Sequence, residues 1–199
     1  AHLRTSRPDL APKVRVVPNM FDARPGEAPV PRAQGGPLRG LFSGSIYGGR
    51  ALAAVGRAVD AAGGDLPGFE GAVLEAAGRS YEGPWNEVLG GSGPRRRVHG
   101  LLSPGEVAGL MNEVHAGIVN NPAWDEIHIP GKLYEYMGAG LPVFNFSRQP
   151  DIPHLCSGVV PCWQLDIHDE AGIVRALREL AQWWRDHPAG PPRPGPDHP

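Results

Sequence analysis

A lysine and a glutamate three residues apart, Lys132 and Glu135, are the side chains of this sequence best placed to do chemistry. They lie in the stretch PGKLYEYMGAGLPVFNF, residues 130–146, whose Pro-Gly start, Gly-Ala-Gly end and following apolar run predict a short helix, a turn and a buried strand. The first turn of a helix has free N–H groups and about half a positive charge, and Lys132 adds a full charge beside it. This arrangement is typical of an anion site that suits a phosphate.

Glu135 lies one turn further along the predicted helix. Its carboxylate could accept two hydrogen bonds from a vicinal diol such as ribose. Lys132, Glu135 and Tyr136 are spaced to share one helix face. The same spacing also describes an ordinary surface ion pair at the start of a helix, because charged pairs three residues apart are common and weak. Spacing alone leaves both interpretations open.

Around this stretch, strand and helix patterns alternate along the chain. Strands are predicted at residues 14–17, 38–46, 71–77, 97–100, 115–120, 141–146 and 159–160, although 71–77 suits a helix equally well. Helices are predicted at residues 50–62, 103–113, 131–138 and 169–186, the second of them starting with a capping box, Ser103-Pro104 with Glu106. This alternation predicts an α/β fold with a doubly wound, mainly parallel sheet and helices on both faces.

In such a sheet, ligands bind beyond the carboxyl ends of the strands. Three short polar or glycine-containing segments fall at these ends: Gly44-Ser45, Gly100-Leu101 and Asn120-Asn121. Together with the helix that starts near Lys132, they predict a binding site at one edge of the sheet.

Residues 130–146 closely resemble the donor-site signature of GT-B glycosyltransferases of the group 1 or family 4-like type, many of which read PxKLxEYMAAGxPV at this place. That group includes retaining hexosyl- and N-acetylhexosaminyl-transferases. The order of elements also follows the Rossmann-like, C-terminal donor half of this family from about Val14 to Trp184. The resemblance implies Gly131, Lys132 and Leu133 at the diphosphate of a nucleotide sugar, and Glu135 at its ribose.

Three further segments resemble this family. VRVVPNMFD resembles the segment that enters the donor half, and LFSGSIYGGR resembles its first strand and glycine loop, which implies Gly44, Ser45 and Arg50 near the diphosphate. HGLLSPGEVAGLMNEVHAGIVNN resembles a stretch whose loop contacts the base through main-chain groups, which implies Leu101 near the base. Arg50 could equally be an exposed helix arginine, and the Ser45 hydroxyl could cap its own backbone.

The sequence departs from the family at one position. Many relatives have a second glutamate, which grips the transferred sugar, eight residues before the ribose glutamate, where this chain has Ile127. The neighbouring Glu126 could serve instead, or the chain belongs with the lysine-type members that lack this acid. His128 could also lie near the sugar, although a lone loop histidine is more often solvated.

Composition excludes several classes of function. A formal net charge of −2 gives no electrostatic case for nucleic-acid binding, and Arg95-Arg96-Arg97 is interpreted as a solvated strand edge. No apolar run approaches the ~20 residues that span a bilayer, and no signal peptide is visible. The 2 cysteines, Cys156 and Cys162, lack zinc or redox spacing and indicate reduced thiols. No metal site or cofactor is expected, because the histidines form no ligand pattern.

The 199 residues suit one α/β domain, predicted at 1–187 with its core at about 14–184, followed by a Pro/Gly-rich tail at 188–199 that we expect to be disordered. The resemblance implies the donor-binding half of a cytoplasmic glycosyltransferase of polysaccharide or glycoconjugate synthesis, with peripheral contact at the inner membrane face left open. Its donor would be a UDP- or GDP-type nucleotide sugar.

The implied partner is an acceptor-binding domain, either preceding Ala1 or in a separate subunit, and the chain alone should transfer little. The face beyond the strand ends should then be open, with Leu101, Ile127 and Ile129 near its rim. Two alternatives remain: half of a nucleotide-sugar epimerase, or a non-catalytic nucleotide-sugar-binding subunit. Trp163, Trp183 and Trp184 are expected to serve packing rather than sugar stacking.

Overall fold

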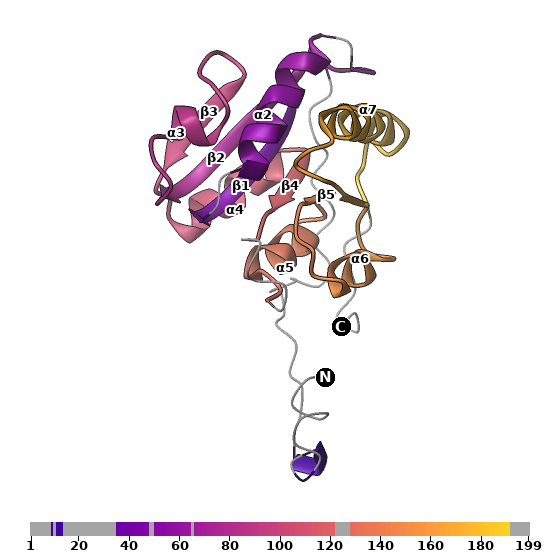
Figure 1. Cartoon of the computed structure of the whole chain (residues 1–199). Helices are drawn as coiled ribbons and strands as arrows, with labels where there is room; N and C mark the ends of the chain where they lie inside the picture. The colour runs from indigo at the N-terminus through magenta and orange to yellow at the C-terminus, as the bar shows by residue number, and fades with distance from the viewer. Residues whose placement is uncertain are drawn as a thin grey trace.

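A parallel sheet of six strands runs through the part of the chain that the structure, a computed structural model, describes: residues 9, 11–13, 35–47, 50–64, 66–121 and 128–191. The strands are β1 (Leu38–Ile46), β2 (Ala72–Ser80), β3 (Arg96–Gly100), β4 (Ala116–Val119), β5 (Val143–Asn145) and β6 (Cys162–Gln164). They are ordered β3-β2-β1-β4-β5-β6, and every neighbouring pair is parallel (Figure 1).

The strand order reverses between β1 and β4. From β1 the chain moves outward through β2 to β3, then returns across both strands to β4 and continues outward on the other side. Adjacent strands whose connections lead in opposite directions leave a crevice at their carboxyl ends, where doubly wound folds bind ligands. The topology therefore places the expected site at the ends of β1 and β4.

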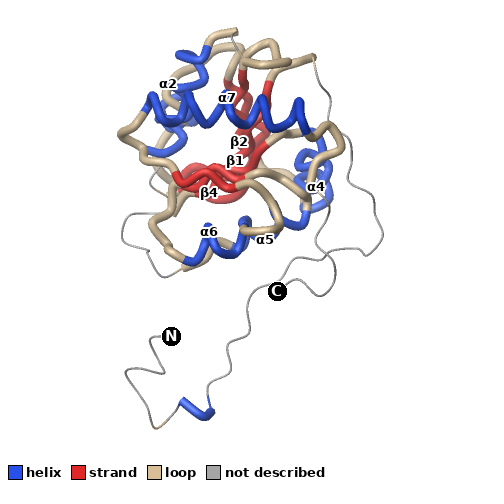
Figure 2. Tube along the Cα trace, turned by 90° about the vertical axis from the view of Figure 1, so that its right-hand side faces the viewer, coloured by secondary structure: helices blue, strands red, loops and turns tan. Residues whose placement is uncertain are grey.

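Helices cover both faces of the sheet. They are α2 (Arg50–Ala62), α3 (Trp85–Val88), α4 (Pro104–Glu113), α5 (Gly131–Gly138), α6 (Asp151–Cys156) and α7 (Glu170–Asp186), besides a 3-10 turn, η1 (Ala11–Lys13). Figure 2 shows α2 and α7 on one side of the strands, with α5 and α6 on the other. The core divides in the same way, with α2 and α7 in one apolar cluster and α4, α5 and α6 in a second. The predicted doubly wound α/β fold is confirmed.

The α2 and α7 layer forms from regular apolar spacing in both helices. Leu52, Val55 and Val59 of α2 are buried, as the sequence predicts, and Asp169 caps α7 by accepting from the Gly172 N–H at 2.8 Å. The predicted buried face of α7 is also confirmed, and comprises Ile173, Leu177, Leu180 and Trp184. The three tryptophans expected to serve packing all belong to or pack against this cluster.

Several predicted elements match the structure closely. The strand predicted at 38–46 and the helix predicted at 50–62 have the bounds of β1 and α2, and the capping box of α4 forms with Ser103 and Glu106. Residues 71–77 take the strand alternative, and β2 runs on to Ser80. The strand predicted at 14–17 lies outside the described residues.

Other predictions of secondary structure are wrong or incomplete. No strand forms at 159–160, because the N–H groups of Val159 and Val160 both donate to the carbonyl of Cys156 and close the end of α6. The last strand, β6, begins at Cys162 instead. The short helices α3 and α6 were not predicted.

The arginine run before and within β3 is not simply a solvated edge. Arg95 donates to the carbonyl of Val59 at 3.1 Å, and Arg96 donates to the carbonyl of Gly56 at 2.6 Å and to the carboxylate of Asp60 at 2.7 Å. These carbonyls lie in the last turns of α2, where cations are favoured. Two of the three arginines therefore hold α2 against the edge of the sheet.

Candidate functional site

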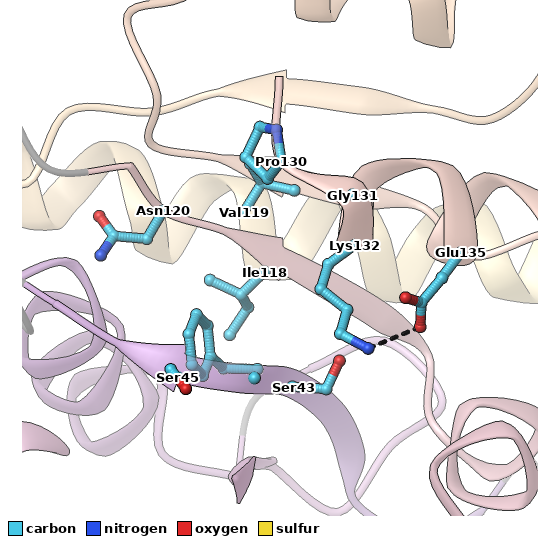
Figure 3. A pocket seen from close by; sticks show the side chains of 11 residues that line it. Ser43, Ser45, Ile118, Val119, Asn120, Pro130, Gly131, Lys132 and Glu135 are labelled. Carbon is cyan, nitrogen blue, oxygen red and sulfur yellow. Dashed lines mark hydrogen bonds and ion pairs between the residues drawn. The ribbon is translucent and has the colours of Figure 1, made fainter. Parts of the chain in front are cut away.

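A cavity of about 310 Å³ opens between the carboxyl ends of β1 and β4 and the start of α5 (Figure 3). We call it the crevice. It lies at the point where the strand order reverses, as the fold predicts. Its walls are Phe42, Ser43, Gly44 and Ser45 from β1, Ile118, Val119 and Asn120 at the end of β4, and Pro130, Gly131, Lys132 and Glu135 around α5.

The first turn of α5 faces this crevice. Pro130 is the N-cap, with extended backbone angles of φ −60° and ψ 134°, and no described side chain caps the turn. Proline suits this place because it lacks an N–H group, and Gly131 keeps the start of the helix exposed. The partial positive charge of the helix end is thus directed at the crevice, where the sequence predicts an anion site.

Lys132 and Glu135 form an ion pair at the crevice wall. The Lys132 Nζ lies 2.7 Å from the Glu135 Oε2, and the two side chains are 35% and 47% exposed. Figure 3 shows Lys132 extending from α5 toward Ser43 of β1. The structure therefore contains the predicted pair, with its cation directed into the cavity.

The end of β1 is shaped by two paired glycines, Gly44 and Gly78. Their φ angles are +126° and +134°, values that L side chains rarely adopt. A Cβ on Gly78 would overlap the carbonyl oxygen of Gly44, and a Cβ on Gly44 would lie 3.8 Å from the Lys132 Cε. Gly78 therefore lets β2 approach β1 closely, and the Lys132 side chain lies within van der Waals reach of Gly44 at the end of β1.

A second, smaller cavity of about 180 Å³, which we call the side cavity, adjoins the crevice. The two cavities share Ser43, Gly44, Ser45 and Lys132, so they meet at the lysine. The remaining walls of the side cavity are Ala77, Gly78, Arg79, Leu101, Leu102 and Val107. Leu101, which the family resemblance places near a base, is 69% exposed there. Arg79 was not singled out from the sequence, although it follows Gly78 at the end of β2.

Other predicted site residues are not brought into either cavity. Arg50 is exposed at the start of α2 and does not line the crevice or the side cavity. The exposed His128 lines neither, and its carbonyl accepts a hydrogen bond from the Asn121 side chain at 2.7 Å. The side chain of Leu133 is fully buried, and its N–H donates to the carbonyl of Pro130. Ile129 packs against the core cluster of α5.

Two predicted residues, Glu126 and Ile127, lie outside the described residues, as does the glycine pair at 48–49.

Behind the crevice lies a buried tyrosine, Tyr136, whose binding partners the sequence did not reveal. Its hydroxyl accepts a hydrogen bond from the Ser43 N–H at 3.0 Å and lies 3.1 Å from the Ser43 Oγ. Burial raises the pKa of Tyr136 to about 12, so the hydroxyl stays protonated near neutral pH. Tyr136 and Lys132 both extend toward β1, which confirms their predicted common helix face.

A buried carboxylate, Glu75 of β2, lies on the same face of the sheet. Arg39 donates two hydrogen bonds to it, at 2.5 and 3.1 Å, and the His99 Nε2 lies 2.7 Å from its Oε2. Burial would raise the pKa of Glu75, but the hydrogen bonds of Arg39 and His99 outweigh it and hold the pKa below its ordinary value. None of these three residues lines the crevice or the side cavity, so this network supports the sheet.

The described ranges contain no group of three or more His, Cys, Asp or Glu side chains that could hold a metal ion. Cys156 and Cys162 are free thiols. No helix within these ranges has the length and apolar character needed to cross a bilayer.

Comparison with known proteins shows the fold. No family model matches the sequence, and no curated protein matches it. The crystal structure of TarM is similar over 94% of this chain, with a TM-score of 0.57 and 9% identity. The structure of a putative UDP-N-acetylglucosamine 2-epimerase from Listeria monocytogenes is similar over 78% of the chain, with a TM-score of 0.50 and 12% identity. This chain spans 36% and 40% of those two proteins. The likeness identifies the Rossmann-like α/β fold.

Proposed function

We propose that this chain is the nucleotide-sugar-binding half of a glycosyltransferase, which transfers a sugar from a UDP- or GDP-type donor to an acceptor. The observation that carries the proposal is the crevice at the reversal of strand order, where Lys132 and the start of α5 face the glycine end of β1. A cation, a helix N-terminus and a glycine-containing strand end around one cavity suit a diphosphate. The matching sequence signature at residues 130–146 supports the same ligand.

In this proposal the diphosphate lies in the crevice between Lys132 and Gly44-Ser45. Negative charge develops on the diphosphate as the bond to the sugar breaks. Lys132 and the helix N–H groups offset that charge without a metal, because they are already directed at the site. Glu135 accepts the ribose hydroxyls, and the base lies in the side cavity beside Leu101.

Ligand binding requires Lys132 and Glu135 to give up their ion pair and to bind different groups of the ligand. The lysine turns from Glu135 to the phosphate, and the carboxylate turns to the ribose. An ion pair with side chains 35% and 47% exposed is worth roughly 0–1 kcal/mol, so the exchange costs little.

The partner we propose is an acceptor-binding domain, in the same polypeptide or in a separate subunit. Three exposed apolar or aromatic residues each follow the last residue of a strand: Tyr47 after β1, Tyr81 after β2 and Leu101 after β3. Exposed apolar side chains gathered at one edge are typical of a surface that another domain covers. The chain alone should therefore bind the donor and transfer little sugar.

A second candidate is half of a nucleotide-sugar epimerase. The structural likeness to the putative UDP-N-acetylglucosamine 2-epimerase favours it. Both candidates bind a nucleotide sugar, but only the transferase passes the sugar to an acceptor. Supplying the chain with its second domain and following the sugar by mass spectrometry distinguishes a new glycoside from an epimerised sugar.

Calorimetric and thermal-shift titration of the purified chain with UDP, GDP, ADP and dTDP, and with their nucleosides, tests the binding proposal. At 100 times Kd the matching diphosphate should add ~2.7 kcal/mol of stability, which raises Tm by roughly 5–10 °C for a chain of this size. EDTA should leave the affinity unchanged. Absence of binding by every diphosphate would contradict the proposal.

A further inference from the structure

The strands β1 and β4 pair only over a short distance. β1 pairs with β2 through nine residues, from Leu38 to Ile46. Its pairing with β4 covers two residues and ends at Leu41 and Gly117, although β1 continues to Ile46. The crevice occupies the space between the unpaired ends of the two strands.

The side chain of Tyr136 lies at the point where pairing stops. Arg39 of β1 exchanges hydrogen bonds with His115 at the start of β4, through its carbonyl at 2.8 Å and its N–H at 3.0 Å. Alternate residues of a strand direct their N–H and C=O groups to the same side, so the N–H of Ser43 also faces β4. It donates to the hydroxyl of Tyr136 at 3.0 Å, and that hydroxyl can donate to the carbonyl of Leu41 at 3.3 Å.

The sequence of β4 makes room for the tyrosine ring. Gly117 is the last β4 residue paired with β1, and a Cβ at this position would overlap the Tyr136 ring. The ring is fully buried, so it fills the space behind the crevice and does not compete with a ligand for it. Any larger residue at Gly117 would force the ring away from β4.

We propose that Tyr136 is a positioning residue that holds the ends of β1 and β4 apart. Its hydroxyl takes the place of the β4 partner that Ser43 would otherwise have. Tyr136 belongs to the same helix as Lys132 and binds the residue before Gly44. It thereby sets the distance between the two walls that contact a diphosphate. This last consequence rests on the proposed function.

The first arm of the test needs no ligand. Amide hydrogen exchange of Ser43 is measured by NMR in the wild-type chain, in Tyr136→Phe and in Tyr134→Phe. Tyr134 is a matched control, because it is a buried tyrosine of the same helix that lines neither cavity. The amide of Leu74, bonded to the carbonyl of Arg95, reports changes in overall stability.

Relative to Leu74, the Ser43 amide should exchange about ten times faster in Tyr136→Phe than in Tyr134→Phe, because only the former loses its acceptor. Equal exchange in the two variants would overturn the proposal. If Tyr136→Phe does not fold, Ser43→Ala removes one contact of the hydroxyl and should accelerate exchange at position 43 by about two- to fivefold. An unchanged exchange rate at position 43 in Ser43→Ala would also overturn the proposal.

The second arm uses the diphosphate that binds in the nucleotide titrations and its nucleoside. Tyr136→Phe should lower the affinity for the diphosphate by about five- to thirtyfold and that for the nucleoside by less than about twofold. Diphosphate affinity equal to that of Tyr134→Phe would overturn the positioning role even if exchange is faster. If the wild-type chain binds no nucleoside diphosphate, the proposed function fails, and the exchange data alone decide whether Tyr136 separates the strands.

Discussion

Replacing Lys132 with alanine is the most direct perturbation of the crevice. The side chain is 35% exposed and paired with Glu135 at 2.7 Å. Two unit charges 4 Å apart interact by ~4 kcal/mol at an effective dielectric constant of about 20 and by ~1 kcal/mol in water. A side chain about one-third exposed lies between these limits. Hydrogen bonds to charged groups contribute roughly 1.5–3 kcal/mol.

The ion pair with Glu135 must be given up when the ligand binds, at a cost below ~1 kcal/mol. With a cost of about 0.5 kcal/mol, the net contribution of Lys132 to diphosphate binding is about 1–2.5 kcal/mol, which corresponds to a roughly 5- to 70-fold loss of affinity in Lys132→Ala. Affinity for the nucleoside should stay within about twofold, because the lysine is assigned to the phosphates.

Isothermal titration calorimetry with the diphosphate and its nucleoside measures both affinities. Arg178→Ala is the matched control, because it removes one positive charge from an exposed residue of α7 outside both cavities. A Lys132→Ala, Glu135→Ala double variant corrects for the carboxylate that the single variant leaves without its cation. Equal losses for both ligands would show that Lys132 supports the fold, and no loss would remove it from the site.

Glu135→Ala should weaken nucleotide binding by about 1.5–3 kcal/mol with an unchanged Tm, and unchanged affinity in calorimetry would reduce Glu135 to a surface charge. Gly78→Ala should lower the free energy of unfolding by about 2–4 kcal/mol in denaturant titration, because the position has a positive φ and a Cβ would overlap the Gly44 carbonyl. The folded-state pKa of Glu75 is lowered, so its stabilisation should be complete above about pH 4.3 and lost as the pH falls below that value. Unfolding free energies measured between pH 7 and pH 3 should therefore fall more steeply in the wild-type chain than in Glu75→Gln, which lacks this titrating carboxylate.

The sequence predicts the fold because its strong signals are local. The strand β1 is an apolar and small-residue segment that leads into a glycine turn. The helix α2 has apolar residues at helical spacing, and Ser103 with Glu106 matches the capping-box pattern. The wrong predictions of strands fall where the local sequence pattern is weak. The strand β6 has three residues with no apolar alternation, and Val159-Val160 looks more like a strand than Cys162–Gln164 does.

For the candidate site, the sequence predicts that Gly44, Leu101 and Lys132 lie at one edge of the sheet, because parallel strands bring their carboxyl ends to the same edge. These residues line the crevice or the side cavity. The sequence does not predict the hydrogen bond between the Ser43 N–H and the Tyr136 hydroxyl, because these residues are 93 positions apart. The helical period places Tyr136 on the face of Lys132, but no local pattern says that its hydroxyl binds a main-chain N–H. Glu75 is missed for a similar reason, because its hydrogen-bond partners Arg39 and His99 come from other strands.

The crevice thus needs both a topology and particular side chains. A reversal of strand order lets β1 and β4 diverge, but the two strands could still pair over their full length if nothing separated them. The Tyr136 hydroxyl supplies the separation, and Gly117 leaves room for the tyrosine ring. Glu135 holds Lys132 beside the crevice while no ligand is bound. Since that pair is partly exposed and weak, the proposed diphosphate could displace Glu135 from the lysine at little cost.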